Sequence, residues 1–190
     1  MSKNILSLTV LVALLGILSG CDIIADAITK THESDRITIA TVWEDTHIIK
    51  GTLTVNAPLT IKACSTIKMD SGASIDIRDN GSIIVIGKPS CKTKFTSYKT
   101  LPSAGDWDAI YLYGTASAGN AFEFVTFEYG GGNYGAVWVE EGADLRIDSS
   151  TFSHIKGKGI QLEEGATLNS FIGNSFKSVT GNPVWTSDLS

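Results

Sequence analysis

Two pairs of glutamates have a spacing that suggests chemistry. Glu140-Glu141 and Glu163-Glu164 occupy the same place in two similar segments that lie 23 residues apart. If those segments stack as neighbouring strands, Glu140 lies over Glu163 at about 5 Å. Such a pair could serve a retaining glycosidase, bind a hard cation such as Ca²⁺, or be solvated turn residues. We favour the solvated turn, keep Glu140 and Glu163 as weak candidate metal ligands, and predict no catalytic residue.

Other arrangements typical of enzymes are missing from the sequence. No nucleophile elbow, zinc-protease motif or credible Cys-His pair is found. One basic side chain, Arg78, lies close to Asp76 and Asp79. Because Ile75 and Ile77 alternate with Asp76, we interpret this group as a surface ion pair beside a turn. The sequence therefore favours a protein that is not an enzyme.

The three cysteines have two different expected roles, one for Cys21 and another for the pair Cys64 and Cys91. Cys21 follows Lys3 and an apolar run of fourteen residues, from Ile5 to Leu18, which is too short to span a bilayer. Residues 18–21, Leu-Ser-Gly-Cys, resemble the lipobox of bacterial lipoproteins. The resemblance implies cleavage of residues 1–20 as a signal peptide and anchoring to a membrane by lipids on Cys21.

The resemblance also suggests a location. Asp22 is similar to the signal that keeps lipoproteins of some bacteria on the periplasmic face of the inner membrane. The outer membrane or the cell surface is the alternative. In such an oxidising compartment, the remaining pair, Cys64 and Cys91, is expected to form a disulfide, with two buried thiols as the alternative.

Charge and histidine placement exclude two classes of ligand. The net charge is −5 and no run of basic residues occurs, so we expect no binding to nucleic acid. His32, His47 and His154 are scattered along the chain, and neither Cys64 nor Cys91 has a second ligand at zinc-site spacing.

The elements that must position these residues follow from an internal repeat. Thr126-Phe127, Thr151-Phe152 and Ser175-Phe176 recur at a period of about 24 residues. Within each repeat, short stretches such as Leu53-Thr54-Val55 and Leu145-Arg146-Ile147 alternate as strands do. Because no helix fits between the strands, the repeat predicts an all-β coil of stacked strands, a parallel β-helix of roughly six rungs.

The repeat also resembles a known family. Segments 59–61, 65–68, 81–83, 94–97 and 105–110 are similar to those of right-handed parallel β-helix proteins of the pectate-lyase-like superfamily. That superfamily includes polysaccharide lyases and glycan-binding proteins. The resemblance implies a right-handed coil and a binding or scaffold role. A polysaccharide lyase, a glycoside hydrolase and a truncated structural remnant are the alternatives.

The sequence predicts three segments. Residues 1–20 are the signal peptide, residues 21–40 are a lipidated tether or an N-terminal cap, and residues 41–190 are the β-helix. The cap would be a short amphipathic helix that includes Ile23, Ile24, Ala27 and Ile28.

A candidate ligand-binding face follows from the alternation. If the flanking Ile, Leu and Val residues point inward, Tyr111, Trp138 and Gln161 form one outward column, with Tyr113 beside it. A row of exposed aromatic rings can stack on sugar rings. We therefore expect a polysaccharide or another envelope component as partner. The alternative is that residues 114–120 or 130–134 fold over the rings.

Overall fold

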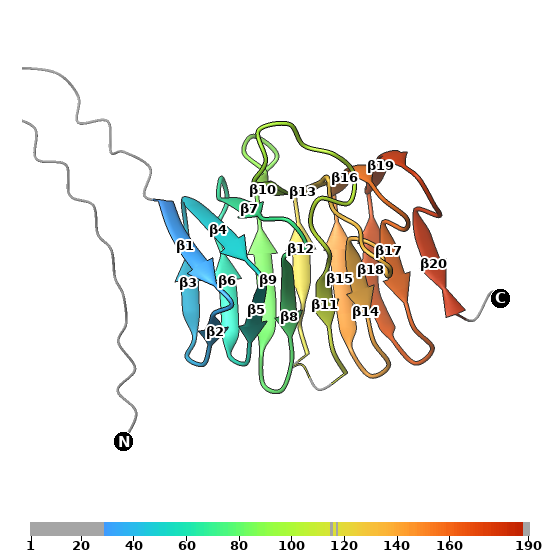
Figure 1. The fold of residues 1–190 in the computed structure, drawn as a ribbon. Coiled ribbons are helices and arrows are strands. Elements are labelled where there is room, and N and C mark those ends of the chain that lie inside the picture. The colour runs from blue at the N-terminus through green and yellow to red at the C-terminus, as the bar shows by residue number, and fades with distance from the viewer. Residues whose placement is uncertain (1–28, 115, 117, 188–190) are drawn as a thin grey trace, which may run out of the picture.

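The computed structural model describes residues 29–114, 116 and 118–187, which form twenty strands in three parallel sheets. Successive strands enter the three sheets in turn, so the chain winds as a right-handed parallel β-helix with its first and last strands at opposite ends (Figure 1). The predicted all-β coil is confirmed. Residues 1–28, which include Cys21, Asp22 and the predicted helical cap, lie outside the described residues.

The sheets are named A, B and C. Sheet A contains β1 (Thr29–Glu33), β4 (Thr46–Lys50), β7 (Thr66–Met69), β10 (Thr93–Ser97), β13 (Val125–Glu128), β16 (Thr151–Ile155) and β19 (Ser175–Val179). Sheet B contains β2 (Arg36–Ile37), β5 (Thr52–Val55), β8 (Ser74–Ile77), β11 (Ile110–Leu112), β14 (Val137–Val139), β17 (Ile160–Leu162) and β20 (Val184–Thr186). Sheet C contains β3 (Thr41–Trp43), β6 (Pro58–Ile61), β9 (Ser82–Ile86), β12 (Ala121–Glu123), β15 (Asp144–Asp148) and β18 (Thr167–Ile172).

The coil begins earlier than the sequence predicted. Strands β1 and β2 precede residue 41 and pair with β4 and β5, so part of the expected tether is the first rung. This rung is short: Thr29 pairs with Thr46 after 17 residues, whereas Thr151 pairs with Ser175 after 24. Strand β1 is almost wholly exposed and lacks the apolar alternation from which the other strands were inferred.

The interior of the coil is apolar because, in most strands, every second side chain points inward and is hydrophobic. Sheet A contributes a stack of rings in which Phe127 lies 4.6 Å from Phe152, and Phe152 lies 4.9 Å from Phe176. The same column continues to Phe95, 5.4 Å from Phe127. The recurring phenylalanines of the sequence are thus one continuous ladder in the core. In the described part of the chain, no helix is long and apolar enough to cross a membrane.

Left-handed backbone residues turn the chain from sheet C into sheet A. Gly173 takes this role in the last rung with φ 69°, and Cys64 takes it after β6 with φ 70°. Cys64 forms the predicted disulfide with Cys91, and their Cα atoms are 5.1 Å apart. The bond ties the corner after β6 to the segment that follows β9.

Candidate functional site

The outward column on sheet B has the predicted register. Tyr111 pairs with Trp138 and Trp138 with Gln161, while the column continues to Asp76 on one side and to Trp185 on the other. Ile110, Leu112, Val137, Val139 and Ile160 are fully buried, as the alternation requires. Side chains of five rungs therefore share this outer face.

Four aromatic rings form one cluster on this face, which we call the aromatic cluster: Tyr111, Tyr113, Tyr134 and Trp138. The Trp138 ring lies 5.7 Å from Tyr111, 5.6 Å from Tyr113 and 5.5 Å from Tyr134. The contacts with Tyr111 and Tyr113 are edge-on, and that with Tyr134 is tilted. These geometries suit the ring quadrupoles and leave ring surface toward solvent.

Tyr134 was not among the predicted site residues. It belongs to the segment 130–134, which was expected either to fold over the column or to leave it open. The segment brings the Tyr134 ring to 6.3 Å from Tyr111, yet Tyr134 itself is 46% exposed. The segment thus extends the aromatic face. A tyrosine that follows three glycines and an asparagine carries no periodic signal, so the sequence could not place its ring.

Polar side chains surround the cluster. The Tyr111 hydroxyl donates to Asp108 at 2.7 Å, and burial together with this carboxylate raises the pKa of the Tyr111 phenol well above its usual range. On the other side, the Arg78 guanidinium lies 4.0 Å from the centre of the Tyr113 ring and bonds Asp76 at 2.6 Å. Burial also raises the pKa of the Tyr113 phenol. Both tyrosine hydroxyls therefore remain neutral donors or acceptors at neutral pH.

The Arg78–Asp76 pair is less superficial than predicted. Asp76 is only 8% exposed and accepts a hydrogen bond from Ser74 at 3.0 Å in addition to the bond from Arg78. The expected ion pair is present, but its carboxylate is not at the surface, because Arg78 and Tyr113 cover the outward Asp76 side chain. Its position at the edge of the cluster was not apparent from sequence.

Gln161 lies in the column but is only 4% exposed. Its amide oxygen accepts from Lys158 at 2.6 Å, and its amide nitrogen donates to Glu163. Lys158 also lies over the Trp185 ring, 4.1 Å from its centre. This polar group separates Trp185 from the aromatic cluster.

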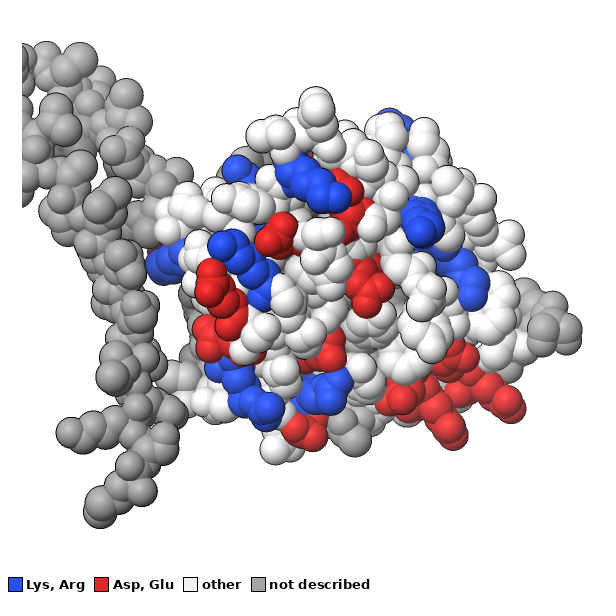
Figure 2. All heavy atoms as spheres, viewed as in Figure 1, with Lys and Arg blue, Asp and Glu red and all other residues white. Residues whose placement is uncertain are grey.

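Glu140 and Glu163, the candidate metal ligands, each accept a hydrogen bond from a neighbouring residue. Glu140 accepts from the backbone amide of Gly114 at 2.9 Å, and Glu163 accepts from the indole of Trp138 at 2.7 Å. Acidic side chains gather over the turns that follow β14 and β17, at the lower right of the view (Figure 2). Among the described residues, no group of three or more His, Cys, Asp or Glu is arranged to hold a metal ion. A Ca²⁺ site at Glu140 and Glu163 stays a prediction.

The structure brings together two histidines that the sequence left scattered. His32 Nε2 and His47 Nδ1 are 3.0 Å apart at the first rung, and both rings stack on Trp43. Their spacing of fifteen residues matches no repeat, because the first rung is shorter than the others. This group lies inside the N-terminal end of the coil and not on sheet B.

Comparison of the chain with protein-family models, with curated proteins and with solved structures finds no match. The class of the protein is therefore defined by its fold: a right-handed parallel β-helix that carries an aromatic cluster on one outer face.

Proposed function

We propose that this protein is a bacterial lipoprotein of the cell envelope that binds polysaccharide through the aromatic cluster and does not catalyse a reaction on it. The observation that carries the proposal is the grouping of four half-buried or exposed rings beside carboxylates on one face. Sugar rings present C–H faces and hydroxyl edges, which aromatic rings and carboxylates can bind together.

The carboxylates hold the rings of the cluster in a fixed orientation. Asp108 and Glu163 each accept a hydrogen bond from a ring of the cluster, Tyr111 and Trp138, at 2.7 Å. The rings are therefore fixed before a ligand arrives, which lowers the entropy cost of binding. The resemblance of the repeat to the pectate-lyase-like superfamily supports a polysaccharide ligand. The lipobox at residues 18–21 supports an anchored protein.

The exposed tyrosines provide a matched pair of variants. Tyr134 belongs to the cluster and is 46% exposed, whereas Tyr98 lies outside it and is 44% exposed. On an array of bacterial polysaccharides, we expect Tyr134→Ala to weaken retention of the full chain about tenfold, because one stacking ring is lost. Trp138→Ala combined with Tyr111→Ala should abolish retention.

Tyr98→Ala should retain the binding of the unmodified chain, and thermal unfolding should be equal for the two single tyrosine variants. Equal retention by Tyr134→Ala, Trp138→Ala/Tyr111→Ala and the unmodified chain would exclude this face. Release of shortened sugars from a bound polysaccharide would instead favour an enzyme.

A further inference from the structure

A second surface, on sheet C, combines aliphatic and cationic side chains near the start of the coil. We define the aliphatic–lysine surface as Ile39, Val42, Thr60, Lys62, Ile84, Ile86 and Lys88. Val42 pairs with Thr60, and Thr60 with Ile84, so these three form an outward column across β3, β6 and β9. Nothing in the aromatic cluster or its proposed ligand accounts for this surface.

The aliphatic members are unusually exposed. Ile39 is 75% exposed, Val42 58% and Ile86 51%. Exposed aliphatic side chains that gather on one face are typical of a surface that another apolar phase covers. A sugar ligand would not select a patch of this kind, because aliphatic side chains lack the flat faces on which sugar rings stack.

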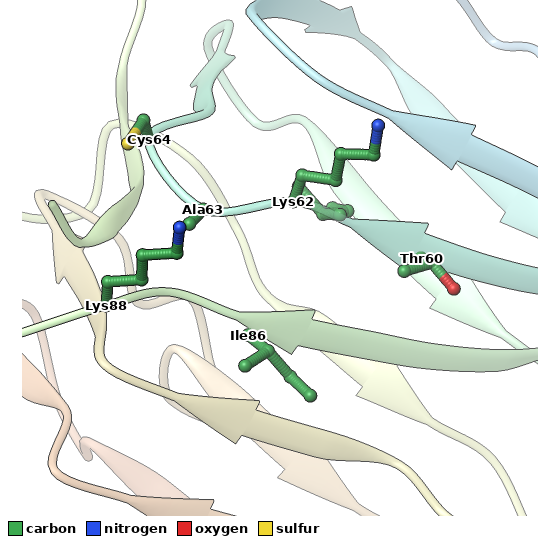
Figure 3. Close-up of a pocket in the computed structure, with 7 residues that line it drawn as sticks. Thr60, Lys62, Ala63, Cys64, Ile86 and Lys88 are labelled. Carbon is green, nitrogen blue, oxygen red and sulfur yellow. The ribbon is translucent and has the colours of Figure 1, made fainter.

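Two lysines border the aliphatic side chains. Lys62 and Lys88 line a solvent-open hollow of about 350 Å³ together with Thr60, Ala63 and Ile86. Figure 3 shows Thr60 and Ile86 on adjacent strands and the Lys88 side chain extending toward Ala63. An open hollow with an aliphatic wall and ammonium groups at its rim fits an anionic headgroup attached to acyl chains.

One of the two lysines beside the hollow keeps its charge free for a ligand. Lys62 bonds Glu44 at 2.9 Å, and Glu123, which pairs with Ile86 in the sheet, lies 3.7 Å from Arg146. Glu44 and Glu123 are thus each paired with a cation, and Arg146 also bonds Asp148 at 2.8 Å. Among the described residues, Lys88 makes no ion pair, so its ammonium is available to a ligand.

The backbone holds Lys88 in place. Lys88 and Cys91 exchange two backbone hydrogen bonds of 3.1 and 3.0 Å, which close a tight turn. The disulfide between Cys91 and Cys64 fixes this turn against the corner after Lys62 and Ala63. Both sides of the hollow are therefore covalently connected, and the lysines approach a surface from a fixed base.

The position of the surface completes the argument. Only eight residue steps separate Cys21 from Thr29, the start of the first rung, and they span at most about 28 Å when extended. This step rests on the proposed lipidation of Cys21. A chain so anchored keeps its first rungs beside the bilayer, and Ile39 and Val42 lie in or next to β3 of the first rung.

We propose that the aliphatic–lysine surface binds the anionic surface of a lipid bilayer, with Ile39, Val42 and Ile86 entering the headgroup region and Lys62 and Lys88 contacting lipid phosphates. The coil then lies with sheet C on the membrane. The aromatic cluster, on sheet B, is left free for a ligand.

Vesicle flotation tests the surface without the lipid anchor. The assay uses the chain from residue 21 with Cys21→Ser; the core described here lies wholly within residues 29–187, so it is retained. Vesicles of phosphatidylcholine are compared with vesicles that also contain phosphatidylglycerol. We expect clear binding to the second kind and weak binding to the first. Because the lipid is absent, failure here would not bear on lipidation or on binding of polysaccharide.

The variants separate the two components of the surface. Val42→Ser combined with Ile86→Ser should weaken binding about tenfold or more, because exposed aliphatic area no longer leaves water. Lys88→Gln should weaken binding to the anionic vesicles about fivefold, the effect of one lysine at an anionic membrane. Ile39→Ser, a single variant at an exposed corner, should also weaken binding.

Matched controls lie elsewhere on the coil. Leu101, 86% exposed, and Lys177, exposed on β19, are outside the surface, so Leu101→Ser and Lys177→Gln should bind as the unmodified chain does. The proposal is overturned if anionic vesicles do not bind the chain, if the controls weaken binding as much as the surface variants, or if free glycerol phosphate binds at the hollow while vesicles do not.

Discussion

Two histidines at the first rung form a short hydrogen-bonded chain. His47 Nε2 donates to the carbonyl of Glu44 at 3.0 Å, so His47 Nδ1 is the acceptor for His32 Nε2, also at 3.0 Å. Both rings stack with Trp43, which is 4% exposed. His47 is therefore buried in its neutral form, because burial disfavours the charged ring.

This arrangement predicts a dependence of stability on pH. Burial, and to a lesser extent the nearby charges of His32 and Lys30, lower the pKa of His47 from its ordinary 6.5 to about 4. As pH falls through 6.5, the unfolded chain binds a proton that the folded chain does not bind until about pH 4. The free energy of unfolding should decrease across that window, by on the order of 2 kcal/mol after allowance for solvent screening.

Denaturant unfolding followed at several pH values checks this expectation. In His47→Gln the decrease between about pH 6.5 and about pH 4 should be smaller than in the unmodified chain, because the titrating group is gone. His154→Gln removes an exposed histidine and should leave the decrease unchanged. An equal decrease in His47→Gln would show that other groups cause it.

At the level of the strand, alternation predicted which side chains face outward but not how deeply neighbours cover them. The register of Tyr111, Trp138 and Gln161 was correct because a period of two residues fixes it. The near-complete burial of Gln161 depends on where Lys158 and Glu163 extend their long side chains, which no periodicity specifies. The sequence therefore predicts which way a side chain faces, but not how far long neighbouring side chains cover it.

Strands without alternation set the other limit. Strand β1 falls in the segment 21–40, which was assigned to a tether or an N-terminal cap. Its residues are polar, and only pairing with β4 makes it part of the coil. The contact between His32 and His47 depends on that pairing. An edge strand draws its order from its neighbour rather than from its own sequence.

The phenylalanine ladder of sheet A gives a prediction at this level. Phe152 is fully buried, with stacked rings on both sides at 4.6 and 4.9 Å. Phe152→Ala should lower the free energy of unfolding by about 3 to 5 kcal/mol, because a cavity is left between two rungs. Denaturant unfolding monitored by far-UV circular dichroism gives the value.

Phe171 offers the matched control. It pairs with the inward Ile147 but belongs to the last rung of sheet C and is 39% exposed. Phe171→Ala should therefore cost clearly less than Phe152→Ala, since less ring area leaves water and its ring contact with Phe176, at 6.2 Å, is longer than either contact of Phe152. Equal losses would mean that the end of the coil is covered as fully as its middle.

For the molecule as a whole, the proposals give each surface a separate role. The aromatic cluster occupies sheet B and the aliphatic–lysine surface occupies sheet C. The disulfide between Cys64 and Cys91 stabilises the corner beside the second surface. A coil of parallel strands is suited to such a division, because each sheet presents its own columns of outward residues. The aromatic cluster acts at the membrane only if the chain is held there.

The last prediction concerns the proposed lipid anchor on Cys21. In a bacterial host, the full chain should incorporate labelled palmitate and sediment with membranes, because a lipid-bearing Cys21 is held by more than one acyl chain. Cys21→Ser should lose the label and should be recovered from membranes only as far as the aliphatic–lysine surface retains it. Cys64→Ala/Cys91→Ala removes the other two cysteines and should keep the label. Label that persists in Cys21→Ser, or that disappears from the double variant, would place the lipid elsewhere and would remove the reason for expecting the first rungs within about 28 Å of a bilayer.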